Sequence, residues 1–296
     1  MIDNLKMLQT KELTLLKELR RVCNKNDIPF FLAYGTLLGA VRHQGFIPWD
    51  DDIDVAMSYP DYVRFREVCR TQLGPDFFLQ TEESDPEAGL SFYKLRLNHT
   101  TLIIDSLADR DIHHGISIDI YPLYHVPDNP LLRWLQLAAS ALYMLFAAGR
   151  APSSHGKKLF LAGRLLLGLF RGRFRAAVKK GCHNTMAAFE QSPTKYRALL
   201  FGNLEVCRKR YPSEIFSQTC QLLFEGEKYP APIGYDRFLR LRYGNYMSPP
   251  PASQRTEKLS HIVKFDPDQS YLKYKGILYC RDPGKNDIMK KERRQR

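Results

Sequence analysis

Long apolar runs, paired cysteine motifs and internal repeats are all missing from this 296-residue sequence. Without an uninterrupted apolar run of about 18 residues, the sequence does not indicate a standard transmembrane helix. The first residues include Asp3 and Glu12 and no compact apolar stretch, so we expect no secretory signal. The six cysteines are scattered without a C-x-x-C pair. This spacing favours buried or free thiols in a reducing compartment over a disulfide framework or a zinc ribbon.

Acidic side chains are absent from residues 129–189, a stretch that holds ten basic ones. The stretch accounts for ten of the twelve net positive charges, so the rest of the chain is close to neutral. We therefore expect the basic character to belong to one module, and not to a nucleic-acid-binding surface spread over the fold. The basic residues are Arg133, Arg150, Lys157, Lys158, Arg164, Arg171, Arg173, Arg175, Lys179 and Lys180.

The overall composition is that of a chain with a sizeable core. With 44% hydrophobic and 26% charged residues, it excludes a wholly disordered, collagen-like or coiled-coil protein. The length favours two domains, or one large domain with an insertion. Apolar periodicity predicts helices over residues 3–24, from 37 onward and from 58 to about 73, and strands over 30–34, 50–57, 92–97 and 116–121, the last ending at Pro122.

Three aspartates in the predicted strand 50–57 are the strongest chemical signal. Asp50, Asp52 and Asp54 are two residues apart, so on a strand their carboxylates point the same way. Like charges on one face repel unless a cation neutralises them, and carboxylate oxygens suit Mg²⁺ or Mn²⁺. The alternative is a solvated acidic turn, which the apolar neighbours on both sides disfavour.

A Gly-Thr turn and three basic residues are candidate phosphate ligands. Gly35 and Thr36 follow a short strand and open a helix, so backbone N–H groups there could approach a phosphate. Lys94 and Arg96 share a face of their strand and could meet donor phosphates, and Arg42 could do so from the loop side. Gly-Thr turns are common, and a single basic residue is more often a surface charge, so these hypotheses depend on the nearby acidic strand.

Asp119 is a lone acid between two isoleucines, late in the predicted strand 116–121. Burying an acid there is costly unless the carboxylate binds a ligand or is paired. Asp119 is therefore the fourth candidate acid of the site.

These motifs together resemble the signature of the LicD family, which includes bacterial phosphocholine transferases and is related to fukutin and fukutin-related protein. The similarity continues through Lys94-Leu95-Arg96, Thr100-Thr101 and residues 115–123, and then through 243–250 and His261. It covers about residues 5–125 and 222–265, and it leaves the basic stretch largely outside. The most specific motif is G-T-L-L-G-A-V-R-H-Q-G-F-I-P-W-D-D-D-I-D at residues 35–54.

The resemblance implies an α+β nucleotidyltransferase-like fold: a small mixed sheet flanked by helices, here with a basic apolar helical insert. Asp52 and Asp54 then correspond to metal ligands, Asp50 to a supporting ligand and Asp119 to the third acid, which could also bind a second metal. His261 is a second candidate base beside Asp119. The expected parts are a catalytic core at 1–128, the insert at 129–189, a segment completing the site at 190–284 and a polar tail at 285–296.

The resemblance also implies a reaction. The family moves phosphocholine from a CDP-linked donor, commonly CDP-choline, to a sugar hydroxyl and releases CMP. We expect a Mg²⁺- or Mn²⁺-dependent enzyme that decorates lipopolysaccharide, teichoic acid, capsule or a lipid-linked glycan precursor. Breaking a pyrophosphate needs charge neutralisation and in-line positioning, which the acids and bases above can serve. The alternatives are a CDP-alditol donor, transfer of the nucleotide itself, or a non-catalytic glycan- or membrane-binding relative.

Two apolar stretches form the basic insert. Residues 134–149 span about 24 Å as a helix, short of a hydrocarbon core of about 30 Å, and residues 159–170 follow. With Lys and Arg at their borders and no acids, they suit a helix pair in an anionic membrane interface. The alternative is a core hairpin with a solvated basic edge; nucleic acid is not expected as a partner. We expect a cytoplasmic protein, peripherally bound to the inner face of the cell membrane.

Overall fold

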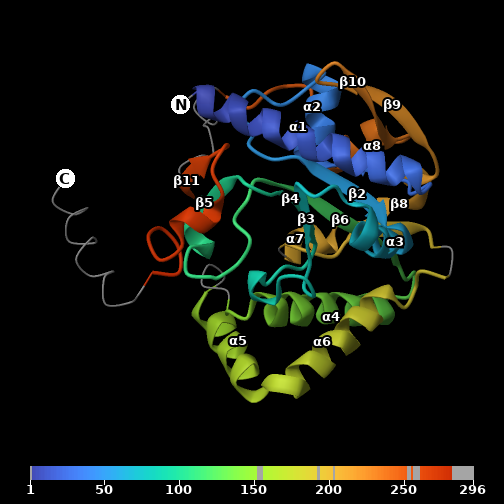
Figure 1. The fold of residues 1–296 in the computed structure, drawn as a ribbon. Coiled ribbons are helices and arrows are strands. Elements are labelled where there is room, and N and C mark those ends of the chain that lie inside the picture. The colour runs from blue at the N-terminus through green and yellow to red at the C-terminus, as the bar shows by residue number, and fades with distance from the viewer. Residues whose placement is uncertain are drawn as a thin grey trace.

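A curled mixed sheet lies at the centre of the molecule, with helices on both sides (Figure 1). The computed structural model describes residues 2–151, 156–191, 194–202, 204–251, 255 and 261–281. The predicted polar tail, residues 285–296, lies outside them. The arrangement of strands and helices confirms the α+β class expected from the sequence.

The sheet has the strand order β1-β2-β6-β4-β3, and β7 and β8 extend it from β6. Strands β2 and β6 run parallel, and the other neighbours are antiparallel. Two antiparallel pairs stand apart from this sheet, the consecutive strands β9 and β10, and β5 with the distant β11. The strands are β1 (Phe31–Leu32), β2 (Asp54–Ser58), β3 (Phe77–Gln80), β4 (Tyr93–Leu97), β5 (Thr101–Ile104), β6 (Ser117–Val126), β7 (Tyr196–Leu199), β8 (Tyr211–Pro212), β9 (Thr219–Phe224), β10 (Glu227–Pro232) and β11 (Ile262–Asp266).

The helices confirm the three predicted in the first 75 residues. Ser58 caps the third of them, because its hydroxyl accepts from the backbone N–H of Asp61. The α-helices are α1 (Ile2–Lys25), α2 (Tyr34–His43), α3 (Tyr59–Gln72), α4 (Pro130–Ala148), α5 (Lys157–Leu169), α6 (Gly172–Ala187), α7 (Leu204–Arg208) and α8 (Tyr235–Tyr243). Short 3-10 turns are η1 (Pro86–Ala88), η2 (Asp105–Leu107), η4 (Ser213–Phe216) and η7 (Tyr271–Tyr274).

Predicted boundaries are wrong for three strands. The strand expected over 30–34 covers only Phe31–Leu32, because Tyr34 already begins α2. The strand expected over 50–57 begins only at Asp54, because Asp50 donates its N–H to the Ile47 carbonyl (2.9 Å) in a turn that keeps it out of the ladder. The strand expected to end at Pro122 continues to Val126. On one side β6 pairs with β4 up to Ile120 and with β7 from residue 123, so Pro122 lies at the change of partner, where its missing N–H costs no ladder bond.

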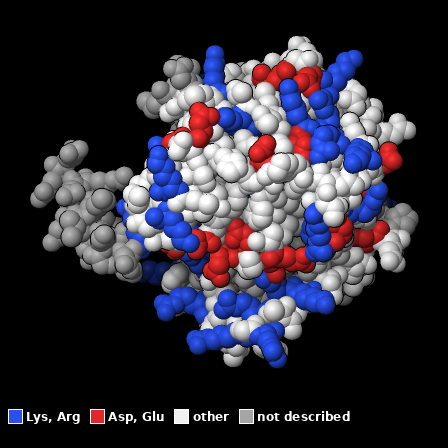
Figure 2. All heavy atoms as spheres, viewed as in Figure 1, with Lys and Arg blue, Asp and Glu red and all other residues white. Residues whose placement is uncertain are grey.

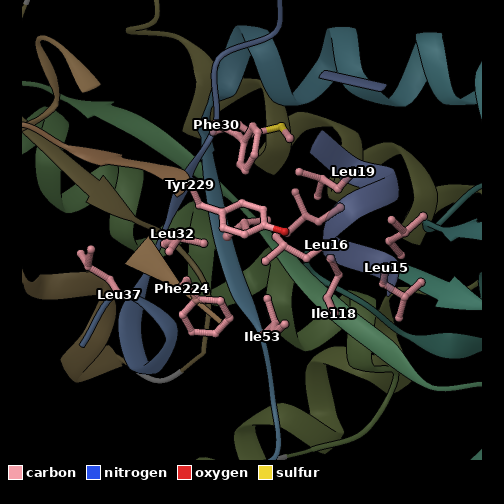
Figure 3. Packing of buried hydrophobic residues seen from close by; sticks show 14 of the residues in the cluster. Leu15, Leu16, Leu19, Phe30, Leu32, Leu37, Ile53, Ile118, Phe224 and Tyr229 are labelled. Atoms are coloured by element: carbon pink, nitrogen blue, oxygen red, sulfur yellow. The ribbon is translucent and has the colours of Figure 1, made fainter. Parts of the chain in front are cut away.

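The main core joins the sheet to α1. Leu15, Leu16 and Leu19 of α1 are fully buried and point toward Ile118 of β6 (Figure 3). Tyr229 of β10 closes the same cluster, so the C-terminal half of the chain packs into the core built by the N-terminal half. This packing fixes α1 and β2 relative to each other, and both matter for the site below.

The basic insert folds as three helices, not as the predicted pair. One face of α4 is anchored to the protein by buried polar side chains: Gln136 donates to the carbonyls of His125 (2.8 Å) and Met186 (2.9 Å), and Ser140 donates to that of Leu200 (3.0 Å). Helix α6 packs beside α4, whereas α5 projects away from the sheet (Figure 1). Among the described residues, α4 alone is long and apolar enough, by length and composition only, to cross a membrane.

Candidate active site

A cavity of about 580 Å³ opens where the acidic segment, the start of α2 and the end of α8 meet. It gathers acids, arginines and aromatic rings from segments far apart in the chain. The lining includes Asp50, Asp52 and Asp54, then Tyr34, Gly35, Leu38, Arg42 and Trp49, then Tyr121 and Phe201, and then Arg242, Tyr243, Asn245, Tyr246, Ser248 and Pro250.

Asp50, Asp52 and Asp54 all line this cavity, while Ile53 and Val55 between and beside them are fully buried in the core. The alternation inferred from sequence thus describes their placement, although only Asp54 belongs to the ladder of the sheet. Ile53 holds the segment against β6, because its carbonyl accepts from the N–H of Asp119 (2.9 Å). The extended chain entering β2 therefore presents the three carboxylates together.

The donor set suits a hard divalent cation. Carboxylate oxygens of Asp50, Asp51 and Asp52 lie within 4.8 Å of one another. Asp54 is buried, and its Oδ1 atom has no hydrogen-bond partner among the residues that the structure describes. Burial, with repulsion from Asp52, Asp119 and Asp50, raises the pKa of Asp54 well above its usual range. An orphaned buried oxygen beside an all-oxygen cluster fits Mg²⁺ or Mn²⁺, which would neutralise this charge.

Asp119 lies on β6 directly beside Asp54 of β2 in the parallel register. On its other side Lys94 of β4 is its register partner and forms an ion pair with it. The hydroxyl of Tyr121 donates to Asp119 Oδ2 (3.1 Å). Asp119 is thus paired, as its apolar flanks require, and the Lys94 ammonium is engaged by a carboxylate at the edge of the site.

The start of α2 is built around the acidic segment. A Cβ at Gly35 would lie 2.5 Å from Asp50 Oδ2, so only glycine allows this approach. Thr36 is buried, and its hydroxyl accepts from the N–H of Asp54 (2.8 Å), so the side chain supports β2. The residue before the helix, Ala33, supplies no side-chain cap, and Tyr34 has a positive φ of 43°. An uncapped N-terminus facing a cavity attracts anions.

Of the two arginines predicted to bind phosphate, only one lies at the cavity. Arg42 lines the cavity and donates to the Tyr246 carbonyl (2.8 Å). Arg96 does not reach it: the residue is 3% exposed, and its guanidinium donates to Gln80 Oε1 (2.6 Å) and the Gly115 carbonyl (2.6 Å). The expectation that Arg96 meets the donor is therefore wrong, because sheet pairing buries this end of β4.

Arg242 of α8 is a cavity residue that the sequence reasoning missed. Its guanidinium lies 5.2 Å from the centre of the Tyr34 ring. It directly precedes the Tyr243-Gly244-Asn245-Tyr246 motif, and this adjacency was the available signal. The C-terminal motif thus reaches the same cavity as the acidic segment, about 190 residues earlier in the chain.

His261 lies beside the acids but outside the cavity lining. Its Nε2 atom is 4.0 Å from Asp51 Oδ2, and its side chain is 45% exposed. Its assignment as a second base stays a prediction.

Glu12 of α1 is another residue that sequence reasoning left out. It is 1% exposed and lies on the apolar face formed by Leu8, Leu15 and Leu19. An acid in the apolar stripe of an amphipathic helix was the signal that could have found it.

Comparison with known proteins identifies relatives over most of the chain. Residues 27–131 match the family model described as "LicD/FKTN/FKRP, nucleotidyltransferase domain". The lipopolysaccharide cholinephosphotransferase LicD of Haemophilus influenzae is 27% identical over 252 residues, which cover 84% of this chain and 93% of that protein. Uncharacterized proteins of Rickettsia typhi and Rickettsia prowazekii are 44% and 43% identical over 54 residues, 18% of this chain and 18% and 20% of theirs. These matches confirm the resemblance inferred from the motifs, and the Haemophilus relative is a transferase of a phosphorus-containing group, as expected.

Proposed function

We propose that the chain is a member of the LicD family, whose model matches residues 27–131, and that it is a cation-dependent phosphotransferase. It moves phosphocholine, or a similar phospho-substituent, from a CDP-linked donor to a hydroxyl of lipopolysaccharide or another cell-surface glycan or lipid-linked precursor, and it releases CMP. On this proposal the sheet and its helices are a nucleotidyltransferase-type fold, the description that the matched family model carries. The observation that carries the proposal is the convergence of the acidic segment, the open start of α2 and two arginines on one cavity.

Each part of the cavity has a role in this reaction. Arg42, Arg242 and the N–H groups at the start of α2 hold the pyrophosphate of the donor. Asp52 and Asp54, supported by Asp50, hold the Mg²⁺ or Mn²⁺, which supplies charge neutralisation at the phosphoryl oxygens. These assignments place positive charge around the group whose negative charge is redistributed during transfer.

Asp119 is the proposed partner of the acceptor hydroxyl. The acceptor oxygen forms a bond to the substituent-bearing phosphorus, the bond from that phosphorus to the CMP oxygen breaks, and the acceptor proton passes to a carboxylate. Lys94 and Tyr121 hold Asp119 in a fixed orientation for this step. His261 is the alternative base, at the Asp51 side of the cluster.

Aromatic rings in the cavity support a choline-bearing group. Tyr121 and Phe201 are stacked with ring centres 4.0 Å apart, and Tyr34 meets Tyr121 edge-on at 5.6 Å. All three line the cavity. Quaternary ammonium groups are bound by aromatic faces, because the ring quadrupole attracts the cation without a hydrogen bond. A CDP-alditol donor would gain less from these rings.

We also propose that α5 and the start of α6 bind the anionic inner face of the cell membrane. Leu161, Leu165 and Leu169 are 62%, 73% and 70% exposed and recur every four residues along one face of α5. Phe174, at the start of α6, is 61% exposed. In Figure 2 this end of the molecule shows basic and uncharged residues without acids, and a band of Asp and Glu crosses the face above it. An exposed apolar stripe bordered by bases suits an anionic lipid interface.

A donor screen tests the enzymatic proposal. The purified chain is incubated with Mg²⁺, a lipopolysaccharide preparation and a series of CDP- and UDP-linked compounds, and released nucleotide is separated by chromatography. The proposal predicts CMP from CDP-choline, with little UMP from the UDP-linked compounds, and no release when EDTA replaces Mg²⁺. Nucleotide release that EDTA does not prevent, or preference for a UDP-linked donor, would contradict the proposal.

A further inference from the structure

A further carboxyl group, that of Glu12, is buried on the face of α1 that meets the acidic segment. We infer that Glu12 is an additional ligand of the cation proposed for the acidic segment, so that α1 completes the site from outside the matched family domain. Glu12 precedes residue 27, where the family match begins. This inference rests on the proposed cation requirement.

Helix α1 is fixed directly to the acidic segment. The Gln9 side chain donates through Nε2 to the backbone carbonyl of Asp50 (2.9 Å). Gln9 and Glu12 are three residues apart, so they share the face of α1 that meets this segment. The helix also packs against β4 and β6, the strands that carry Lys94 and Asp119. The position of Glu12 beside the cluster is therefore set by rigid elements.

One oxygen of the buried Glu12 carboxyl group lacks a hydrogen-bond partner among the described residues. The residue is 1% exposed, and its Oε2 atom has no hydrogen-bond partner in the described part of the chain. Most buried polar atoms are hydrogen-bonded, and an unpaired buried carboxyl group is costly. An apolar side chain in this stripe of α1 would avoid the cost, and a shared cation would compensate for it.

Electrostatics agree with this geometry. Burial, followed by repulsion from Asp52, Asp51, Asp119 and Asp50, raises the pKa of Glu12 well above its usual range. The cluster therefore acts on Glu12 through like charge. A divalent cation among these oxygens would turn each repulsion into a bridged contact.

The alternative is that Glu12 remains a neutral carboxylic acid with a packing role only. The two possibilities differ in what the Glu12→Gln substitution does. Glutamine keeps the size and the polarity of the side chain but is a weaker ligand. A packing residue would tolerate the change without effect on cation binding, whereas a ligand would not.

Mn²⁺ titration followed by the electron paramagnetic resonance signal of free Mn²⁺ tests the inference on the full chain. We expect Glu12→Gln to raise the Kd for Mn²⁺ at least about tenfold, as loss of one charged ligand does. Without cation, its melting temperature should equal or exceed that of the wild type, because repulsion is relieved. Glu12→Asp, which keeps the charge but shortens the reach, should also weaken binding and covers the case in which Glu12→Gln does not fold.

Glu18→Gln is the matched control on the same helix. Glu18 is also buried, but its carboxylate is paired with Arg21 and accepts from the N–H of Gly74 (2.9 Å). This variant should lose thermal stability and keep the wild-type Kd for Mn²⁺. Wild-type affinity in Glu12→Gln or in Glu12→Asp would overturn the ligand role alone. A wild-type chain that binds no Mn²⁺ would overturn both this inference and the proposed cation requirement.

Discussion

Asp54 shows how single side chains in this site are held by their neighbours. Its N–H donates to the Thr36 hydroxyl, its strand partner is Asp119, and one of its carboxylate oxygens has no partner in the described part of the protein. The backbone N–H of Asp54 is thus hydrogen-bonded, whereas one oxygen of its side chain at the cavity has no partner among the described residues. This combination is stable only when something other than the protein compensates the charge.

Substitution of the metal-binding aspartates should therefore separate stability from activity. Asp52→Asn or Asp54→Asn removes a ligand charge without changing size, so turnover should be abolished while the fold persists. In EDTA the melting temperature of either variant should not fall below that of the wild type, and relief of repulsion should raise it for Asp54→Asn. Circular dichroism melts and CMP release at saturating Mg²⁺ measure the two effects. Near wild-type turnover in either variant would contradict the assignment of these carboxylates as metal ligands.

Asp119 should affect the rate more than donor binding. As a positioned base, it is expected to contribute about 10²-fold or more to kcat. Asp119→Asn should lower kcat by that factor and change the donor KM much less, because Asp119 does not line the cavity that holds the donor. Steady-state kinetics over a range of CDP-choline concentrations give both constants. Loss of donor binding with kcat intact would reassign Asp119 to the donor pocket.

At the residue level the sequence predicted the acids better than the bases. Alternation along an extended segment is a local property, so it placed Asp50, Asp52 and Asp54 together correctly. The partner of a basic side chain depends on which residue the neighbouring strand places opposite it. Lys94 meets Asp119 and Arg96 meets Gln80 across strand pairs that only the folded sheet defines.

Strand β6 is the element that joins the two halves of the chain, and Glu190 secures it from the end of the insert. Glu190 Oε1 accepts from the N–H of His125 in β6 (2.9 Å), while Oε2 is buried and finds no hydrogen-bond partner among the described residues. Burial raises the pKa of Glu190 from 4.5 to about 7. The folded state therefore binds this proton more tightly than the unfolded state, and the resulting stabilisation is complete below about pH 4.5 and lost as pH rises through about 7.

Glu190→Gln should flatten the dependence of stability on pH. Between about pH 4.5 and pH 7, wild-type stability should fall relative to the variant by up to about 3 kcal/mol, since one pKa unit corresponds to about 1.36 kcal/mol. Urea unfolding at several pH values measures this difference. Glu205→Gln, at a carboxylate whose side chain is 78% exposed on α7, is the control and should follow the wild type. Parallel profiles for the wild type and Glu190→Gln would refute the role of this carboxyl group.

Helix α5 and the start of α6 carry the proposed membrane contact. The charges of basic residues there can be reversed without altering the cavity. Each Lys or Arg near an anionic surface contributes about 1 kcal/mol at low salt. Lys157→Glu, Lys158→Glu and Arg171→Glu together should abolish flotation with anionic vesicles and preserve CMP release with a water-soluble acceptor analogue.

The matched control reverses three exposed lysines elsewhere, Lys6, Lys25 and Lys228, with the same change in net charge. It should float with anionic vesicles as the wild type does. If the wild type itself stays soluble with anionic vesicles at low salt, the α5 stripe does not bind membrane.

Element ends were harder to predict than element types. The turn at Ile47 and Asp50 and the continuation of β6 past Pro122 both depend on which partner strand is present. From local sequence a proline predicts the end of a strand. Pro122, however, lies where β6 changes its partner strand, so its missing N–H costs no ladder bond. The third insert helix was missed because Gly172 opens α6 without a side-chain cap.

At the scale of the whole molecule, function is distributed over three regions that the chain order does not keep together. The acidic segment and the α8 end form the cavity, α1 covers the acids on the core side, and the insert projects from the opposite side of the sheet (Figure 1). The sequence predicted the regions by composition and motif. Their juxtaposition depends on long-range packing, such as Tyr229 against α1, which no local pattern encodes.

The central claim is that this cavity directs attack at the substituent-bearing phosphorus and expels CMP. Slow hydrolysis of CDP-choline in H₂¹⁸O with Mg²⁺, followed by mass spectrometry of both products, tests it without knowledge of the acceptor. Water then replaces the acceptor hydroxyl, so the labelled product identifies the phosphorus that is attacked. The account predicts ¹⁸O in phosphocholine and unlabelled CMP, with no labelled product from Asp52→Asn. Label in CMP would show attack at the nucleotide phosphorus, make the chain a nucleotidyltransferase and contradict the account.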